Sequence, residues 1–163
     1  MDIVFYIASI VAIFSTIMVI TRANAVHALL YMIVSLFSVA IVMYGLGAPF
    51  VAALEVIVYA GAIMVLFIFV VMMLNLGKET EEKERQLLQP KIWAGPSLLA
   101  AILFAEFIFM LVHGQFHLTG SAVIEAGDVG YSLFTSYMLG VELAAMLLLA
   151  GLVGAFHLGK NLR

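Results

Sequence analysis

The chain has 163 residues and a formal net charge of -3, and 66% of its residues are hydrophobic while only 10% are charged. Soluble domains carry about a quarter of their residues as charged side chains, so this composition indicates an integral membrane protein. The few basic residues lie at the ends of apolar segments rather than in a basic patch, which argues against nucleic acid as a partner.

Apolar stretches long enough to cross a bilayer follow one another along the chain, since about 20 helical residues span about 30 Å of hydrocarbon. The first stretch, from Ile3, lacks the positive n-region and cleavage site of a signal peptide and is expected to be a retained span. The sequence predicts an all-α membrane protein, one membrane domain over 1–163, with five transmembrane helices at about 3–20, 26–46, 50–76, 92–112 and 133–157. The connections include a charged cytoplasmic loop at 77–91 and an outer loop at 113–132.

The basic residues predict the orientation of these helices. With the N-terminus outside, the five-span arrangement places every lysine and arginine on the cytoplasmic side, as the positive-inside rule requires. These residues are Arg22, Lys78, Lys83, Arg85, Lys91, Lys160 and Arg163. Four or six spans would break the pattern, so we expect a periplasmic N-terminus and a cytoplasmic C-terminus.

The third stretch contains "LEVIVYAGAIMVLF", residues 54–67, and is longer than a span needs to be. As a straight α-helix, residues 50–76 would measure about 40 Å. Either a tilt or a π-bulge near Gly61 accommodates the excess, and both interpretations stay open. Glu55 and Tyr59 are four residues apart and share one helix face, where a carboxylate and a phenol can hold a chain of water.

Three glutamates fall inside predicted spans, about 7 to 14 Å below the outer boundary: Glu55, Glu106 and Glu142. An ionised side chain at the centre of a span costs about 2.5 to 3.5 kcal/mol on insertion scales, so such groups usually face protein or water. Each is therefore a proton-path candidate, together with Tyr59. The alternative is that each carboxyl snorkels or is neutral and hydrogen-bonded within the helix bundle.

Catalytic groups are missing from the sequence. There is no cysteine for an iron–sulfur cluster or a redox pair, and the four histidines lie near span ends, where they cannot hold a haem between facing helices. We expect no catalytic residue, no metal site and no cofactor site in this chain.

The run "EVIVYAGAIMVLFIFVVMML", residues 55–74, with five spans and a charged loop after the third, resembles the subunit J family of proton-translocating bacterial NADH:quinone oxidoreductase. The mitochondrial counterpart is NADH dehydrogenase subunit 6 of respiratory Complex I. The resemblance implies a multi-pass, non-redox subunit of the membrane arm, in the bacterial inner (plasma) membrane. Its neighbours would be the quinone-cavity subunit and a small subunit with buried glutamates, and NADH, FMN, iron–sulfur clusters and quinone would belong to partner subunits.

The resemblance also implies a role for the third helix in coupling quinone reduction to proton pumping. In this family that helix can hold a π-bulge, and conversion between π and α forms is thought to open or close a water path. Mapped onto this sequence, the bulge and gate candidates are Tyr59, Ala60, Gly61, Ala62, Ile63, Val65 and Phe67. Two alternatives are a purely structural scaffold subunit and a subunit of a related cation/proton antiporter complex.

Overall fold

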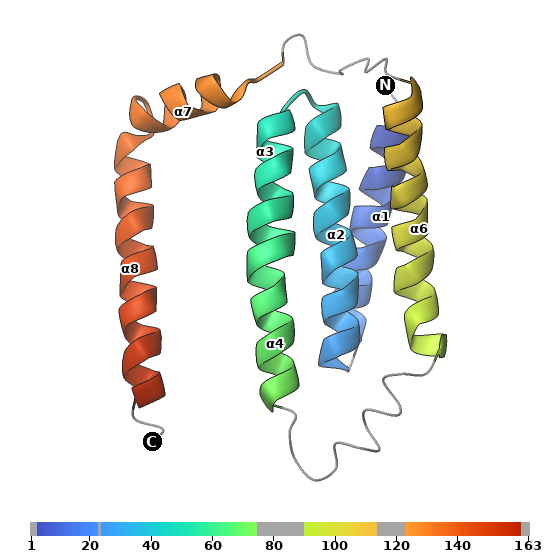
Figure 1. Cartoon of the computed structure of the whole chain (residues 1–163), viewed down its shortest axis with the longest axis horizontal. Helices are drawn as coiled ribbons and strands as arrows, with labels where there is room; N and C mark the ends of the chain where they lie inside the picture. Colours follow the sequence, from blue (N-terminus) through green and yellow to red (C-terminus); the bar gives the residue numbers. More distant parts are fainter. Residues whose placement is uncertain (1–2, 23, 75–89, 114–122, 161–163) are drawn as a thin grey trace. The chain divides into compact units, whose positions relative to one another are not determined.

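The computed structural model describes residues 3–22, 24–74, 90–113 and 123–160, and these residues form helices and turns without any strand. The chain divides into two compact units, Met1–Val123 and Ile124–Arg163. Figure 1 shows the helices of each unit in sequence colours.

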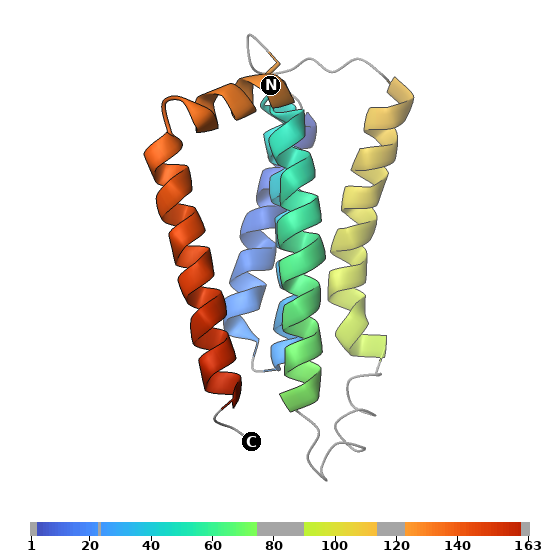
Figure 2. The ribbon, with the colours of Figure 1, turned by 60° about the vertical axis from the view of Figure 1, so that its left-hand side comes forward.

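The first unit is a bundle of membrane-length helices. The third predicted span is one unbroken helical rod (Figure 2). Within it a π-helix, η1, separates two α-helical parts. Helix α2 is central, because it contacts α1, all three parts of the rod and α6. The elements are α1 (Ile3–Thr21), α2 (Ala25–Gly45), α3 (Pro49–Leu54), η1 (Glu55–Ile63), α4 (Met64–Leu74) and α6 (Pro90–His113).

Local sequence explains the ends of α2. The Asn24 side chain accepts a hydrogen bond of 3.1 Å from the His27 amide, which caps the first turn. At the other end Gly47 has a φ of 87°, a conformation that glycine adopts without steric cost. The chain reverses there, and Pro49 begins α3 in the first helical position, where its missing N–H costs nothing.

The core of the first unit is small and lies where α1, α2 and α6 meet. We call Val11, Val34 and Leu103 the core cluster, since each is at most 6% exposed and they pack together. Ala8 on α1 and Ser38 on α2 are fully buried, and such small side chains let helices approach closely.

The second unit contains α7 (Ala126–Phe134) and α8 (Met138–Lys160), joined by a turn at residues 135–137. Helix α7 begins inside the segment that the sequence predicts as the outer loop 113–132. A capping box explains this start, because the Glu125 amide donates to the Asp128 carboxylate at 3.1 Å and the Glu125 side chain accepts from the backbone in return.

Four helical stretches among the described residues are long and apolar enough to cross a membrane: Ile3–Thr21, Ala25–Gly45, Pro49–Met73 and Met138–Lys160. Helix α6 adds a shorter apolar run, Trp93–Phe109. The fifth span and the orientation remain predictions. The charged loop predicted at 77–91 lies almost wholly outside the described residues, which omit 75–89.

Candidate functional site

The π-helix η1 occupies the part of the rod for which the sequence left a tilt and a wider turn open. It runs over Glu55–Ile63 and includes the predicted bulge residues from Tyr59 onward. The wide geometry persists to its end, where the Met64 amide is hydrogen-bonded to the carbonyl oxygen of Tyr59, five residues back. π-Helical turns are rare and often lie at functional sites, so η1 is the first candidate.

One side of the rod is packed against α2. Ala52, Ala60 and Met64 are 5%, 7% and 2% exposed, so small side chains let α2 approach η1 and a flexible methionine fills the space below. Of the predicted bulge residues, Ala60 is therefore the one that is buried.

The predicted gate residues lie on the other sides of the rod. Tyr59, Val65 and Phe67 are 52%, 61% and 54% exposed, and Ile63 is 38% exposed. Glu55 is half-buried at the first turn of η1. Among the described residues of the first unit, these side chains therefore enclose no water path.

Gly61 is the glycine of η1, and the backbone leaves little room for a side chain there. A Cβ atom added to it would lie 3.1 Å from the carbonyl oxygen of Val56, a contact that forces one of the two atoms to move. A β-branched side chain at this position would add further atoms to the same crowded turn. Glycine therefore suits the π geometry for a steric reason.

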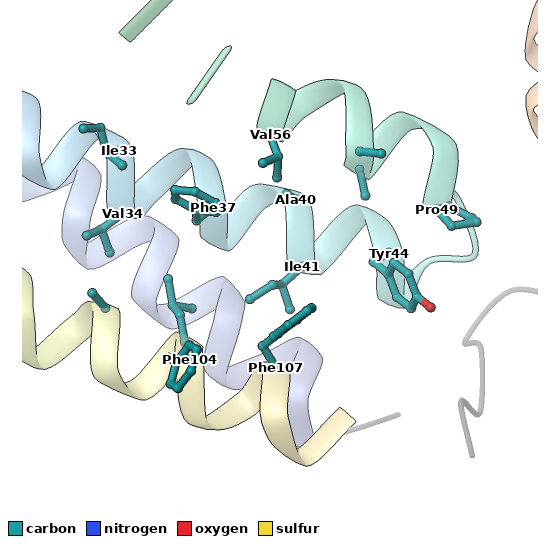
Figure 3. Close-up of a pocket in the computed structure, with 14 residues that line it drawn as sticks. Ile33, Val34, Phe37, Ala40, Ile41, Tyr44, Pro49, Val56, Phe104 and Phe107 are labelled. Carbon is teal, nitrogen blue, oxygen red and sulfur yellow. The ribbon is translucent and has the colours of Figure 1, made fainter. Parts of the chain in front are cut away.

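An apolar groove of about 590 Å³ adjoins η1 where α2, α3 and α6 meet (Figure 3). Figure 3 shows Phe37 and Ile41 of α2 across from Phe104 and Phe107 of α6, with Val56 of η1 on a third side. The groove thus lies between η1 and α6, and most of the side chains that line it are hydrocarbon. Its complete lining is Ile33, Val34, Phe37, Ala40, Ile41, Tyr44, Pro49, Ala52, Ala53, Val56, Ala100, Leu103, Phe104 and Phe107.

The three intramembrane glutamates have different surroundings. Glu106 on α6 is only 7% exposed, and neither carboxyl oxygen has a hydrogen-bond partner among the described residues. Glu55 and Glu106 belong to separate helices that both pack against α2. Glu142 lies in the second unit, on α8, and its side chain is exposed.

Comparison with known proteins decides the family. Residues 15–158 match the family model of the NADH-ubiquinone/plastoquinone oxidoreductase chain 6. The chain belongs to this family. A relative from Pseudomonas aeruginosa, NADH-quinone oxidoreductase subunit J, is 53% identical over 99% of this chain and 98% of its own length. The protein of the same name from Escherichia coli K12 is 52% identical over all of this chain and 89% of its own.

Membership of the chain 6 family confirms the resemblance drawn from residues 55–74, and it makes this chain a membrane subunit of an NADH-quinone oxidoreductase. A relative from Buchnera aphidicola subsp. Schizaphis graminum, with the same subunit name, is 46% identical over 99% of both chains. Within the described ranges, no group of three or more histidine and acidic side chains is arranged to hold a metal ion, and the sequence has no cysteine.

Sequence reasoning missed two polar features of this chain 6 family member. A hydroxyl pair joins α1 to α2, where Thr16 Oγ1 and Ser35 Oγ are 2.9 Å apart. The Tyr31 ring packs so closely on Gly95 of α6 that a Cβ there would overlap the phenol oxygen. The signal for the first was the recurrence of hydroxyl and small residues every three to four positions in the first two spans. Nothing in the sequence pairs Tyr31 with Gly95.

Proposed function

We propose that this subunit couples quinone reduction to proton pumping by switching η1 between π-helical and α-helical forms, which opens or closes a water path along the third span. The observation that carries the proposal is the π-helix at Glu55–Ile63, in a rod with a carboxylate and a phenol on its wide turns. The chain itself transfers no electrons in this account.

The switch follows from helix geometry. Each α-helical residue advances the chain by about 100° around its axis. When a wide turn gives up its extra residue, the segment beyond it rotates by about that amount relative to the segment before it. With α3 held against α2, the rotation would carry Val65 and Phe67 on α4 to a new side of the rod. Apolar side chains moved in this way can interrupt or release a line of water.

Neighbouring subunits of the complex would complete the polar path that Glu55 and Tyr59 begin. Tyr59 is exposed on η1 and Glu55 is half-buried, so both can meet groups from a neighbouring chain. The proposed neighbours are the quinone-cavity subunit and the small glutamate-bearing subunit of the membrane arm. NADH, FMN, iron–sulfur clusters and quinone would be bound by partner subunits. The chain would cross the bacterial inner membrane five times, with the N-terminus outside.

The test is Gly61→Val in the assembled complex. Because an added Cβ at this position crowds Val56 O, the larger side chain should block the exchange between the two helix forms. We expect NADH oxidation in membrane vesicles to continue with fewer protons pumped per electron. Gly45→Ala in α2 is the matched control, since a Cβ there meets no atom within 4 Å and pumping should be unchanged. Full pumping in an assembled Gly61→Val complex would refute the switch.

A structural scaffold is the second candidate, and the apolar surface of the rod favours it. Side chains such as Leu66, Phe67 and Phe69 are more than half exposed and suit packing against other membrane subunits. Neutralising Glu55, Glu106 and Glu142 discriminates the two roles. Loss of assembly alone supports a scaffold, whereas an assembled but uncoupled enzyme supports a proton path. Nothing favours an antiporter subunit, since the relatives compared above all have the NADH-quinone oxidoreductase name.

A further inference from the structure

Hydroxyl groups recur along α1 and α2, separate from η1, and one pair of them, Thr16 and Ser35, joins the two helices. Tyr31, Ser35 and Ser38 recur every three to four residues and so share one face of α2. All three are buried, and none of them lines the apolar groove. With Ser15 and Thr16 of α1, we call these five residues the hydroxyl seam.

The seam is polar along its length but not fully satisfied. Thr16 Oγ1 donates to the carbonyl oxygen of Ala12 at 2.8 Å and lies 2.9 Å from Ser35 Oγ. Ser38 Oγ donates to Val34 O at 2.8 Å, which leaves its lone pairs as acceptors. Ser15 is fully buried, and its Oγ has no hydrogen-bond partner among the described residues. A buried hydroxyl without a protein partner is the kind of group that an internal water satisfies.

One end of the seam opens on charged and aromatic groups. The His27 and Tyr31 rings have centroids 5.2 Å apart, and the Arg22 guanidinium carbon is 5.8 Å from the Tyr31 centroid. Arg22 is exposed at the end of α1. Because an arginine at the end of a span extends its charged group to the membrane surface, we place this end of the seam at the aqueous phase.

The other end of the seam lies toward the level of Glu106. Helices α2 and α6 run in the same direction and α1 runs oppositely (Figure 1). Ser38 and Glu106 follow Val34 and Leu103 by about one turn, and Ala8 precedes Val11 by about one turn. Because α1 runs opposite to α2 and α6 (Figure 1), these three steps all lead toward the same end of the bundle. The three residues therefore lie at one level. The small side chains of Ala8 and Ser38 leave room there for the buried carboxyl group.

Among the described residues of α1, α2 and α6, no positively charged side chain lies at the level of Glu106. In the sequences of α1, α2 and α6, the charged and imidazole side chains besides Glu106 are His27 near the start of α2, and Lys91 and His113 near the ends of α6. The other titratable side chains described on these three helices are the phenols of Tyr6, Tyr31 and Tyr44. An ionised carboxylate without a partner is costly inside a span, whereas a carboxylic acid can donate its proton to an acceptor such as Ser38 Oγ.

We propose that Glu106 is a proton-binding site that exchanges its proton with the aqueous phase at the Arg22 end, through the hydroxyl seam and the water held in it. Each hydroxyl or water on the way accepts one proton and releases another, and the carboxylate takes up the last one. Apart from Tyr44, the side chains that line the groove are hydrocarbon, among them Ile41, Phe104 and Phe107, so the groove is a poorer route for a proton than the hydroxyl seam. The inference rests on the proposed function in one respect, that the chain works in a proton-translocating complex. It does not require η1 to switch between two forms.

The test is infrared spectroscopy of the assembled complex in oriented vesicles. The C=O stretch of the protonated Glu106 carboxyl is assigned as the band that Glu106→Gln removes, and the rate at which this band changes after a buffered pH jump on one side of the membrane measures proton exchange from that side. We expect exchange from the Arg22 side, and a two- to ten-fold slower rate, about the equivalent of one lost hydrogen bond, in Ser35→Ala/Ser38→Ala. Ser9→Ala is the matched control, because Ser9 Oγ donates to Phe5 O at 2.7 Å outside the seam.

Three results would overturn the inference: no Glu106-dependent band, faster exchange from the opposite side, or equal rates in the seam and control variants. Thr16→Val provides a second seam variant of similar volume if the double variant does not assemble, and it should slow exchange in the same way. Gly61→Val separates the two proposals. We expect it to reduce pumping and leave Glu106 exchange unchanged, so normal pumping would refute the switch alone.

Discussion

Replacing Gly95 with alanine tests the contact between α2 and α6 most sharply. The added methyl group would overlap the phenol oxygen of Tyr31, whose side chain is only 5% exposed and has little room to move. Overpacking of this kind costs about 1 to 3 kcal/mol. Alanine in place of a helical glycine stabilises the helix by about 1 kcal/mol, because alanine has the higher helix propensity. We therefore expect Gly95→Ala to lower the free energy of unfolding by about 0 to 2 kcal/mol.

A double-mutant cycle with Tyr31→Phe isolates the steric part of this change. Phenylalanine lacks the overlapping oxygen, and the next ring atom is 3.1 Å from the added carbon, a tight contact that small shifts relieve. In the Tyr31→Phe background, Gly95→Ala should be neutral or stabilising by up to about 1 kcal/mol. The coupling energy should then be about 1 to 3 kcal/mol. Unfolding of the four variants in mixed micelles by titration with a denaturing detergent measures it, and additive effects would refute the packing.

Other positions give independent predictions. Glu106→Leu removes a buried carboxyl group that has no hydrogen-bond partner among the described residues. We expect pumping to fall, while the yield of assembled complex after heating equals or exceeds that of wild type. A lower yield would contradict the burial of Glu106. Gly47→Ala forces a side chain into a φ of 87° and should destabilise the chain by about 1 to 2 kcal/mol in the same micelle titration. Asn24→Ala removes the cap of α2 and should cost about 1 kcal/mol, whereas Asn24→Asp should retain stability.

The sequence predicted the helical class and the family, but not which faces of the helices are buried. In a soluble helix the apolar stripe identifies the buried side. Here α4 is apolar on every side, so no stripe distinguishes Met64, which is 2% exposed, from Val65, which is 61% exposed. Packing of small residues selects the buried side instead, as Ala60 does against α2.

Features of the chain that depend on backbone conformation could be anticipated from residue type. Features that depend on contacts between helices could not. Gly61 and the length of the third stretch made a widened turn one of two interpretations, beside a tilt, and η1 lies there. Helix α7 was missed because its nine residues are too few for a span and its start depends on the Glu125–Asp128 capping box. The burial of Glu106 could not be inferred either, since it depends on how α6 turns its Leu103 face toward α1 and α2.

The central claim is that the third span has two helical forms in turnover. The most direct measurement is the structure of this span in the assembled complex, determined in a resting state and during NADH oxidation with quinone. The account predicts π-helical hydrogen bonds over Glu55–Ile63 in one state. In the other it predicts a continuous α-helix, with Val65 and Phe67 rotated by about 100° relative to α3. The same helical form in both states, with protons pumped, would contradict it.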